Sequence, residues 1–191
     1  MILYNSELEK IEIDESDMPI TAAIVEFLSI QEWDDKIIID ENQNEGNLRF
    51  KMTINGQSHQ FYIESHESND FITVYTYSVF TVPPKKMPEM SRLLNLININ
   101  LSIGRVACSD DDDNNAVQYK LRYDVTGGKC SGKMINLAVD SATYAFRTYG
   151  EAMASVALTK TTAKEAWAAY VASQEQGDED DSDDNDAPTE L

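Results

Sequence analysis

Residues 82–128 read VPPKKMPEMSRLLNLININLSIGRVACSDDDDNNAVQYKLRYDVTGG and carry the strongest structural signals in the chain. Two consecutive prolines near the start end the preceding strand, because proline cannot donate a hydrogen bond to a sheet ladder. From about Pro88 to Leu101, apolar residues recur at helical spacing, which predicts an amphipathic helix. A short strand at 105–108 and a clearly alternating strand at 117–125 are joined by a polar turn, which predicts a hairpin.

A β-rich region precedes the two prolines. Apolar and polar residues alternate from Leu48 to Ile54, the period of a half-buried strand, and Asn55-Gly56 supplies a type I′ turn into a return strand. Residues 71–80 have apolar or aromatic side chains on both sides, so we expect a central strand there. Earlier still, helical spacing predicts a helix from about Pro19 to Gln31, with Asp17 as its N-cap.

A long helical region follows the Gly-Gly pair that closes the hairpin. Small and apolar positions keep to one face from Ser131 to Leu158. Thr162 and Glu165 then have the spacing of a capping box, which starts a further short helix. The predicted order is therefore α-β-β-β(-β)-α-β-β-α. Helices packed on an antiparallel sheet in this order make the fold class α+β.

The chain is strongly acidic. Its 191 residues include 34 acidic and 15 basic side chains, for a formal net charge of −19. Binding of nucleic acid relies on Lys and Arg contacts with phosphates, so we expect no nucleic-acid partner. We expect no membrane association for the same reason, and no apolar run approaches the roughly 18 residues of a membrane span. With no visible signal peptide and only two cysteines, we expect a cytoplasmic protein with free thiols.

The acidic residues are concentrated near the end of the sequence. From Glu175 onward there are nine acids and no base, and removing these nine from −19 leaves −10 for the rest. Like charges at this density repel each other and cannot bury enough apolar area to offset chain entropy. We therefore expect an N-terminal extension at 1–16, an α+β domain at 17–158, a short C-terminal helix at 159–173 and a disordered acidic tail at 174–191.

The stretch at 82–128 resembles the signature of the YbjN family of bacterial sensory transduction regulators. That signature has a strand ending in Val-Pro, a helix with a Leu-Leu-Asn core and a later Asn, a Gly-Arg strand, an acidic turn and a strand leading to Gly-Gly. The matching segments here are Val82-Pro83-Pro84, Leu93-Leu94-Asn95, Asn98, Gly104-Arg105, Asp110–Asp113 and Tyr119–Gly128. The order of the elements also matches over roughly residues 17–158.

The resemblance implies a fold similar to that of type III secretion chaperones, which are small α+β domains that often dimerise and bind partner polypeptides. It implies a non-enzymatic regulatory or chaperone-like protein, a homodimer that binds other polypeptides in sensory transduction or a stress response. The helix around 161–172 and the acidic tail lie beyond the family pattern.

No residue pattern assembles a catalytic or cofactor site. His59 and His66 are seven residues apart, which is not the spacing of a metal-binding pair. Cys130 begins a helix, where the dipole lowers thiol pKa values, but neither histidine is adjacent in sequence to act as its base. Asp110–Asp113 lacks the glycine and distal glutamate of a calcium loop. We therefore expect no enzyme activity, cofactor or metal; the alternatives are a small-ligand or divalent-cation sensor and an enzyme that uses Cys130.

Aromatic and methionine residues around the predicted central strand form the candidate partner surface. They are Tyr75, Tyr77, Phe80, Met87 and Met90. Residues of these types are more often buried in a core. Where the second face of the strand is left uncovered, however, tyrosine and methionine suit an adaptable surface for binding protein.

Overall fold

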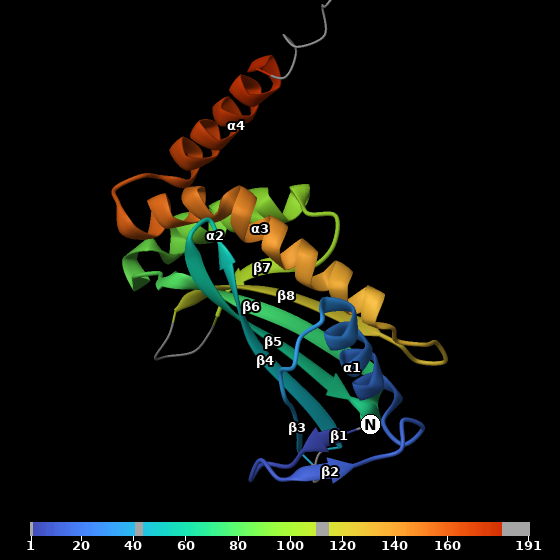
Figure 1. Ribbon diagram of the computed structural model, residues 1–191. Coiled ribbons are helices and arrows are strands. Elements are labelled where there is room, and N and C mark those ends of the chain that lie inside the picture. Colours follow the sequence, from blue (N-terminus) through green and yellow to red (C-terminus); the bar gives the residue numbers. More distant parts are fainter. Residues whose placement is uncertain (1, 41–43, 110–114, 181–191) are drawn as a thin grey trace, which may run out of the picture.

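The computed structural model describes residues 2–40, 44–109 and 115–180 and has an α+β fold built on one eight-stranded sheet (Figure 1). The strand order is β2-β1-β3-β4-β5-β6-β8-β7. The strands are β1 (Ile2–Tyr4), β2 (Lys10–Glu12), β3 (Ile37–Asp40), β4 (Glu45–Ile54), β5 (Gln57–His66), β6 (Phe71–Thr81), β7 (Arg105–Cys108) and β8 (Ala116–Asp124). The helices are α1 (Pro19–Gln31), α2 (Met87–Asn100), α3 (Gly132–Leu158) and α4 (Ala163–Asp180).

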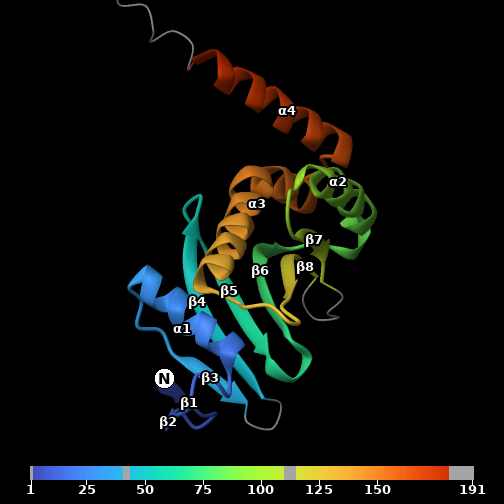
Figure 2. The ribbon, with the colours of Figure 1, turned by 90° about the vertical axis from the view of Figure 1, so that its right-hand side faces the viewer.

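Helices α1 and α3 cover one face of the sheet (Figure 2). Side chains alternate between the two faces of a strand, and most helix-facing positions of β4, β5 and β6 carry apolar residues. Leu48, Phe61 and Val74 are examples, and each is at most 1 % exposed. Ile24 and Phe27 of α1 belong to the same core. Burial of this apolar area, which contributes about 25 cal/mol per Å², is the main stabilising term of the fold.

The elements from α1 to α3 follow one another in the order predicted from the sequence, which confirms the α+β class. β6 lies between β5 and β8, as expected for a strand with apolar residues on both sides. β7 and β8 form the predicted antiparallel hairpin. Asn55 and Gly56, which join β4 to β5, both have positive φ, as a type I′ turn requires.

Two N-terminal strands extend the sheet beyond the elements predicted from the sequence. β1 pairs with β2 in antiparallel orientation and with β3 in parallel, where Tyr4 lies opposite Ile38. α1 lies between β2 and β3 in the chain, and a helical crossover of this kind allows strands to pair in parallel. The sheet is therefore mixed at this edge and antiparallel elsewhere. β1 and β2 have three residues each, too few for an alternating pattern to be recognised.

The N-terminus of α1 is capped by a residue far away in the sequence. Asp17 was the predicted N-cap, but the cap position is Met18, which forms no side-chain cap hydrogen bond. Instead the Glu67 carboxylate accepts hydrogen bonds from the backbone N–H groups of Ile20 at 3.1 Å and Thr21 at 2.7 Å. A carboxylate in this place also interacts favourably with the positive end of the helix dipole. No local sequence pattern could predict this cap.

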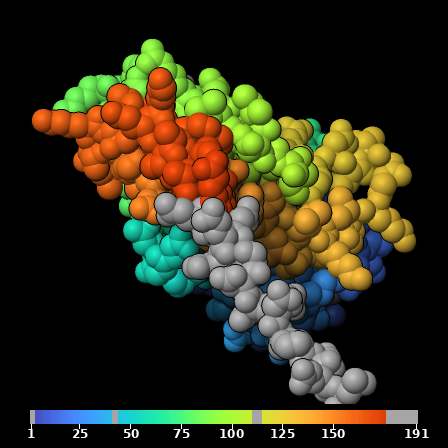
Figure 3. Space-filling view, turned by 90° about the horizontal axis from the view of Figure 1, so that it is seen from above, coloured from blue at the N-terminus to red at the C-terminus, as the bar shows by residue number. Residues whose placement is uncertain are grey.

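α4 extends beyond the short helix expected at 159–173, since it runs to Asp180 and includes the first residues of the acidic segment. The predicted capping box starts it: the Thr162 N–H donates to the Glu165 carboxylate at 2.8 Å. Once a helix has begun, each added residue costs little, and Glu and Gln are good helix formers. The first turns of α4 lie beside α2 (Figure 3), and the helix then projects away from the sheet (Figure 1). The rest of the predicted tail, 181–191, lies outside the described residues.

Candidate functional site

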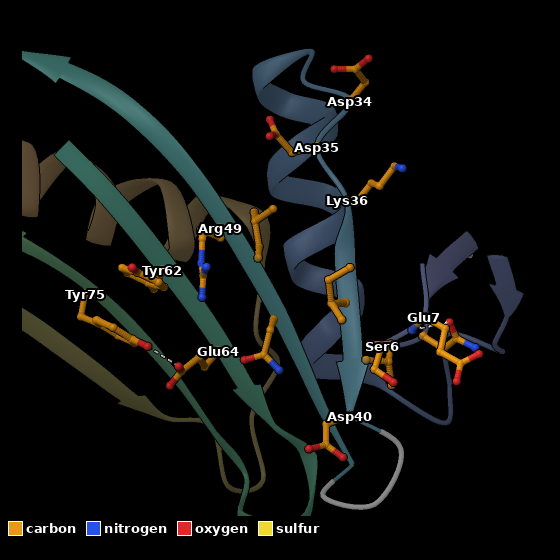
Figure 4. Close-up of a pocket in the computed structure, with 15 residues that line it drawn as sticks. Ser6, Glu7, Asp34, Asp35, Lys36, Asp40, Arg49, Tyr62, Glu64 and Tyr75 are labelled. Carbon is orange, nitrogen blue, oxygen red and sulfur yellow. Dashed lines mark hydrogen bonds between the residues drawn. The ribbon is translucent and has the colours of Figure 1, made fainter. Parts of the chain in front are cut away.

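The face of the sheet opposite α1 and α3 carries no helix over its central strands in the described part of the chain, and we call it the open face. In Figure 4 it faces the viewer and α1 lies behind the strands. It consists of the outward residues of β4, β5, β6 and β8, namely Asn47, Arg49, Lys51, Gln60, Tyr62, Glu64, Phe71, Thr73, Tyr75, Tyr77, Gln118, Lys120 and Arg122.

The centre of the open face is a tyrosine cluster of Tyr62, Tyr75 and Tyr77, all half-buried. The rings of Tyr62 and Tyr75 stack with centroids 4.9 Å apart and planes 6° apart, and Tyr77 meets both edge-on. Gln118 donates a hydrogen bond of 2.9 Å to the Tyr77 hydroxyl. Burial, followed by the hydrogen bond from Tyr75 to Glu64, raises the pKa of Tyr75 well above its ordinary value. The Tyr75 hydroxyl therefore stays neutral at physiological pH.

Arginine side chains cover aromatic rings on both sides of this cluster. The Arg49 guanidinium lies 4.9 Å from the centroid of the Tyr62 ring, and the Arg122 guanidinium lies 3.3 Å from that of Phe71. Cation–π contacts of this kind contribute about 0.5–1 kcal/mol at exposed sites. They hold the long arginine side chains close to the sheet.

A hollow of about 1170 Å³ opens beside the tyrosine cluster on the β3–β4 side (Figure 4). Arg49, Tyr62 and Tyr75 line it from the sheet, and Ser6 and Glu7 line it from the turn after β1. Its other charged lining residues are Asp34, Asp35, Lys36, Asp40 and Glu64.

A smaller hollow of about 310 Å³ lies at the opposite end of the open face, where β7 and β8 meet α2. Arg105 and Lys120 line it, together with the polar side chains of Ser91, Asn95, Asn98 and Gln118. The Asn98 amide donates to the Val106 carbonyl at 2.9 Å and accepts from the Val106 N–H at 2.8 Å. One asparagine side chain thus makes both hydrogen bonds to the Val106 backbone that a neighbouring strand would make at the outer edge of β7.

The five residues of the predicted partner surface occupy different environments. Tyr75 and Tyr77 lie on the open face. Phe80 and Met87 are partly buried against the core, and Met90 is fully buried, so Met90 does not belong to any surface. Met90 lies on the apolar stripe of α2, and this stripe packs inward.

Sequence reasoning missed two members of the open face that come from neighbouring strands. Tyr62 and Arg49 lie directly opposite each other in the β4–β5 hairpin, and Tyr62 lies opposite Tyr75 in β6. The alternation of β4 placed Arg49 on the polar side, and the hairpin turn fixes the β4–β5 register, so this signal was available in the sequence. The contact between Tyr62 and Tyr75 of β6 could be found only once β5 and β6 were aligned.

The structure argues against Cys130 as a nucleophile. Burial, and the charges of Glu67 and Glu26 nearby, raise the pKa of its thiol to about 11, although a backbone hydrogen bond at Ser131 opposes the rise. The side chains of the two histidines contact other groups: His59 Nδ1 lies 3.1 Å from the Tyr77 carbonyl, and His66 pairs with Glu45. Cys108 and Cys130 are both free thiols.

The described residues contain no group of three or more His, Cys, Asp or Glu side chains arranged to hold a metal ion. The acidic turn at 110–113, which the sequence suggested as a possible cation site, lies outside the described residues. None of the helices between residues 2 and 180 combines the length and hydropathy needed to cross a bilayer.

A family model matches residues 26–155; it is that of YbjN, described as "Putative bacterial sensory transduction regulator". No curated protein sequence matches the chain. Among solved structures, a chain of the HopA1–SchA chaperone–effector complex matches with a TM-score of 0.47 at 11 % identity, over 71 % of this chain and 98 % of that one.

Two further solved structures are similar to this chain. The crystal structure of "YbjN, a putative transcription regulator from E. coli" matches with a TM-score of 0.46 at 12 % identity, over 67 % of this chain and 89 % of that one. A chain of the ExsC–ExsE complex matches with a TM-score of 0.42 at 7 % identity, over 66 % of this chain and 89 % of that one.

Proposed function

Because the chain belongs to the YbjN family, we propose that it is a non-enzymatic regulatory or chaperone-like protein that binds segments of other polypeptides. The observation that carries the proposal is the half-buried tyrosine cluster on a sheet face that no helix of the described residues covers. We propose the open face as the binding site and Tyr75 and Tyr77 as contact residues, with Tyr62 and Arg49 beside them.

The residue types of the open face favour binding of protein. Tyrosine and arginine are enriched among the residues that contribute most to protein interfaces. Tyrosine buries much area with few rotatable bonds to immobilise, and arginine presents a planar set of hydrogen-bond donors. A tyrosine also offers an apolar ring and a hydroxyl that can pair with a peptide group. The larger hollow beside Tyr62 and Tyr75 provides space for a side chain of the bound segment.

Selection of peptides from a random library against the full chain tests this function. We expect a set of peptides that bind, and we expect Tyr75→Ala to weaken their binding about tenfold or more. The control is Ile30→Ala, which removes a 46 % exposed apolar side chain from α1 on the helix side of the molecule. Arg49→Ala, an exposed position, gives a second test if Tyr75→Ala unfolds. Peptides that bind equally well to wild type, Tyr75→Ala and Arg49→Ala would contradict the proposed site.

The homodimer, the cytoplasmic location and the role in sensory transduction or stress response belong to the same proposal. Leu137 and Tyr144 support self-association: they lie two turns apart on α3 and are 55 % and 50 % exposed. Light scattering at micromolar concentration should give the mass of two chains, and Leu137→Asp should give that of one. A strict monomer for the wild-type chain would contradict the dimer.

A further inference from the structure

One row of residues crosses the open face and connects the two hollows. Its members lie directly opposite one another on successive strands, in the order Arg49, Tyr62, Tyr75, Lys120 and Arg105. We call it the Arg–Tyr row. Because neighbouring strands lie about 4.8 Å apart, the row is about 19 Å long. A ligand that follows it contacts a cation, two tyrosines and two further cations.

The last two residues of the row form an unfavourable pair. Arg105 and Lys120 lie opposite each other in the β7–β8 register, and both are exposed. Like charges in directly opposite positions destabilise a sheet. In the described ranges, neither side chain forms an ion pair with a carboxylate. Both side chains line the smaller hollow, so an anionic group bound there would relieve the repulsion.

The acidic residues of the central strands on this face are few, whereas Glu7, Asp34, Asp35 and Asp40 surround the larger hollow beyond Arg49. Glu45 pairs with His66, Glu64 accepts a hydrogen bond from Tyr75, and Asp124 accepts one from the Thr126 N–H. The bases of β4, β7 and β8 on this side are Arg49, Lys51, Arg105, Lys120 and Arg122, a third of all 15 in the chain. The open face is therefore locally cationic at its β7–β8 end, where Arg105 and Lys120 line the smaller hollow and none of its described lining residues is acidic, in a chain of net charge −19. Since salt screens charges over about 8 Å, a ligand responds mainly to this local charge.

The ends of the sheet do not favour addition of a further strand. At one edge, the Asn98 side chain already binds the N–H and carbonyl of Val106 in β7. At the other edge, β2 has only three residues. A partner polypeptide is therefore expected to lie on the open face and to be recognised through its side chains.

The tyrosine cluster suits a peptide better than a single-stranded nucleic acid. Bases bind to aromatic residues by stacking on a free ring face. Here Tyr62 and Tyr75 stack on each other, and the Arg49 guanidinium covers Tyr62. The cluster presents ring edges and hydroxyl groups. These can pack against the side chains of a polypeptide and form hydrogen bonds with its amide groups.

We infer that the open face binds an acidic polypeptide segment. Arg105 and Lys120 hold its carboxylates in the smaller hollow, and its apolar or aromatic side chains pack on the tyrosine cluster. This inference rests on the proposed function and specifies the chemistry of the partner. It also explains why a strongly acidic chain places five bases on one sheet face.

Fluorescence anisotropy with the full chain tests the inference. The probes are a peptide of about eight residues that alternates Glu with Val and Tyr, which is long enough to span the row, and the same peptide with Lys for Glu. Oligo-dT of similar length is the third probe. We expect the acidic peptide to bind and the other two to bind about tenfold more weakly or not at all. We expect added salt to weaken the binding of the acidic peptide.

Charge reversal on the sheet provides the matched variants. The double variant Arg105→Glu/Lys120→Glu keeps a like-charge pair in the same place and reverses only its sign. The repulsion within the pair is therefore similar in the variant and in the wild-type chain. We expect it to weaken binding of the acidic peptide about tenfold or more. Lys160→Glu with Lys164→Glu makes the same change in net charge at exposed positions around the start of α4, and we expect no effect.

The outcomes separate this inference from the proposed function. If the lysine peptide binds in place of the acidic one and Tyr75→Ala weakens that binding, the acidic partner is overturned and the proposed function stands. An equal loss in the Lys160→Glu/Lys164→Glu control also overturns the inference, because the effect would then come from net charge alone. If oligo-dT binds and neither peptide does, the inference and the proposed function are both overturned.

Discussion

At the scale of single residues, the environment of Cys130 determines how its thiol reacts. Its pKa is raised mainly by burial, from 9.0 to about 11. The thiolate is the nucleophile, so we predict that iodoacetamide modifies Cys130 more slowly than a free cysteine at neutral pH. In the Cys108→Ser variant, where Cys130 is the only thiol, the rate of alkylation should rise with a midpoint near pH 11. A midpoint near pH 9 would mean that burial leaves the thiol unperturbed, and a midpoint well below about pH 8 would mean that the thiol is activated.

The same shift gives the fold a dependence on alkaline pH. The unfolded thiol loses its proton near pH 9, whereas the folded one keeps it until about pH 11. The unfolded state therefore binds fewer protons in this window, and the free energy of unfolding falls as the pH rises through it. We predict that Cys130→Ala shows a weaker decline between pH 9 and 11 than the wild-type chain, measured by urea denaturation at each pH.

Asn98 closes the edge of the sheet with a single side chain. Asn98→Ala removes two hydrogen bonds to Val106 and leaves the backbone groups of a strand edge without these partners. We predict a loss of about 1–2 kcal/mol in the free energy of unfolding. The control is Asn95→Ala, an exposed position one turn earlier on α2, which should change it by less than about 0.5 kcal/mol. Equal effects of the two substitutions would contradict a role for Asn98 at the edge.

Residue type and periodicity in the sequence predict part of the candidate site. The alternation along β6 placed Tyr75 and Tyr77 on one face, and the structure has them there. The spacing placed Met90 on the apolar stripe of α2, which favours the core over the candidate surface, and the structure buries it there. The hydrogen bonds of Glu67 to α1 were beyond prediction, because they join residues 46 and 47 positions apart.

At the scale of elements, the close approach of α1 and α3 depends on one glycine. A Cβ added at Gly132 would lie 2.6 Å from the Phe27 backbone nitrogen, and the Gly132 N–H donates to Glu26 at 2.8 Å. We predict that Gly132→Ala lowers the free energy of unfolding by about 1–3 kcal/mol, because the α1 backbone must move.

Gly150 in the same helix provides a control of opposite sign. A Cβ added there would meet nothing within 4 Å. Gly150→Ala should therefore stabilise the protein by about 0.5–1 kcal/mol, since alanine favours the helix. Thermal and urea denaturation of the two variants side by side would decide the matter, and the same sign for both would contradict the close approach of α1 to α3.

Elements were predictable from the sequence where their signal was local. α1, α2 and α3 have long apolar stripes, and their predicted bounds lie within one residue of those in the structure. β1 and β2 gave no such signal, and the parallel pairing of β1 with β3 arises only after α1 has crossed the sheet. The length of α4 was underestimated because the repulsion between its acids does not prevent a helix that has already started.

At the scale of the whole molecule, we propose that stability and charge reside in different parts of the chain. The first turns of α4 are packed: Ala163 and Ala166 are each 3 % exposed, and Trp167 stacks on Tyr149. Truncation after Ser173 should change the free energy of unfolding by less than about 0.5 kcal/mol. Truncation after Thr162 should lower it by about 2 kcal/mol, because it uncovers apolar surface on α2 and α3. Similar losses in the two truncated chains would place part of the core beyond Ser173.

Truncation after Ser173 also separates local from overall charge. It removes nine acids and brings the net charge from −19 to −10, while the five bases of the open face remain. If these bases attract an acidic segment, the distant acids oppose its approach through long-range repulsion. We predict that the truncated chain associates with the glutamate peptide several-fold faster at low salt, and that the difference disappears near 0.3 M salt as screening shortens to about 6 Å. Stopped-flow anisotropy measures both rates. Equal rates at low salt would mean that the distant acids do not influence the open face.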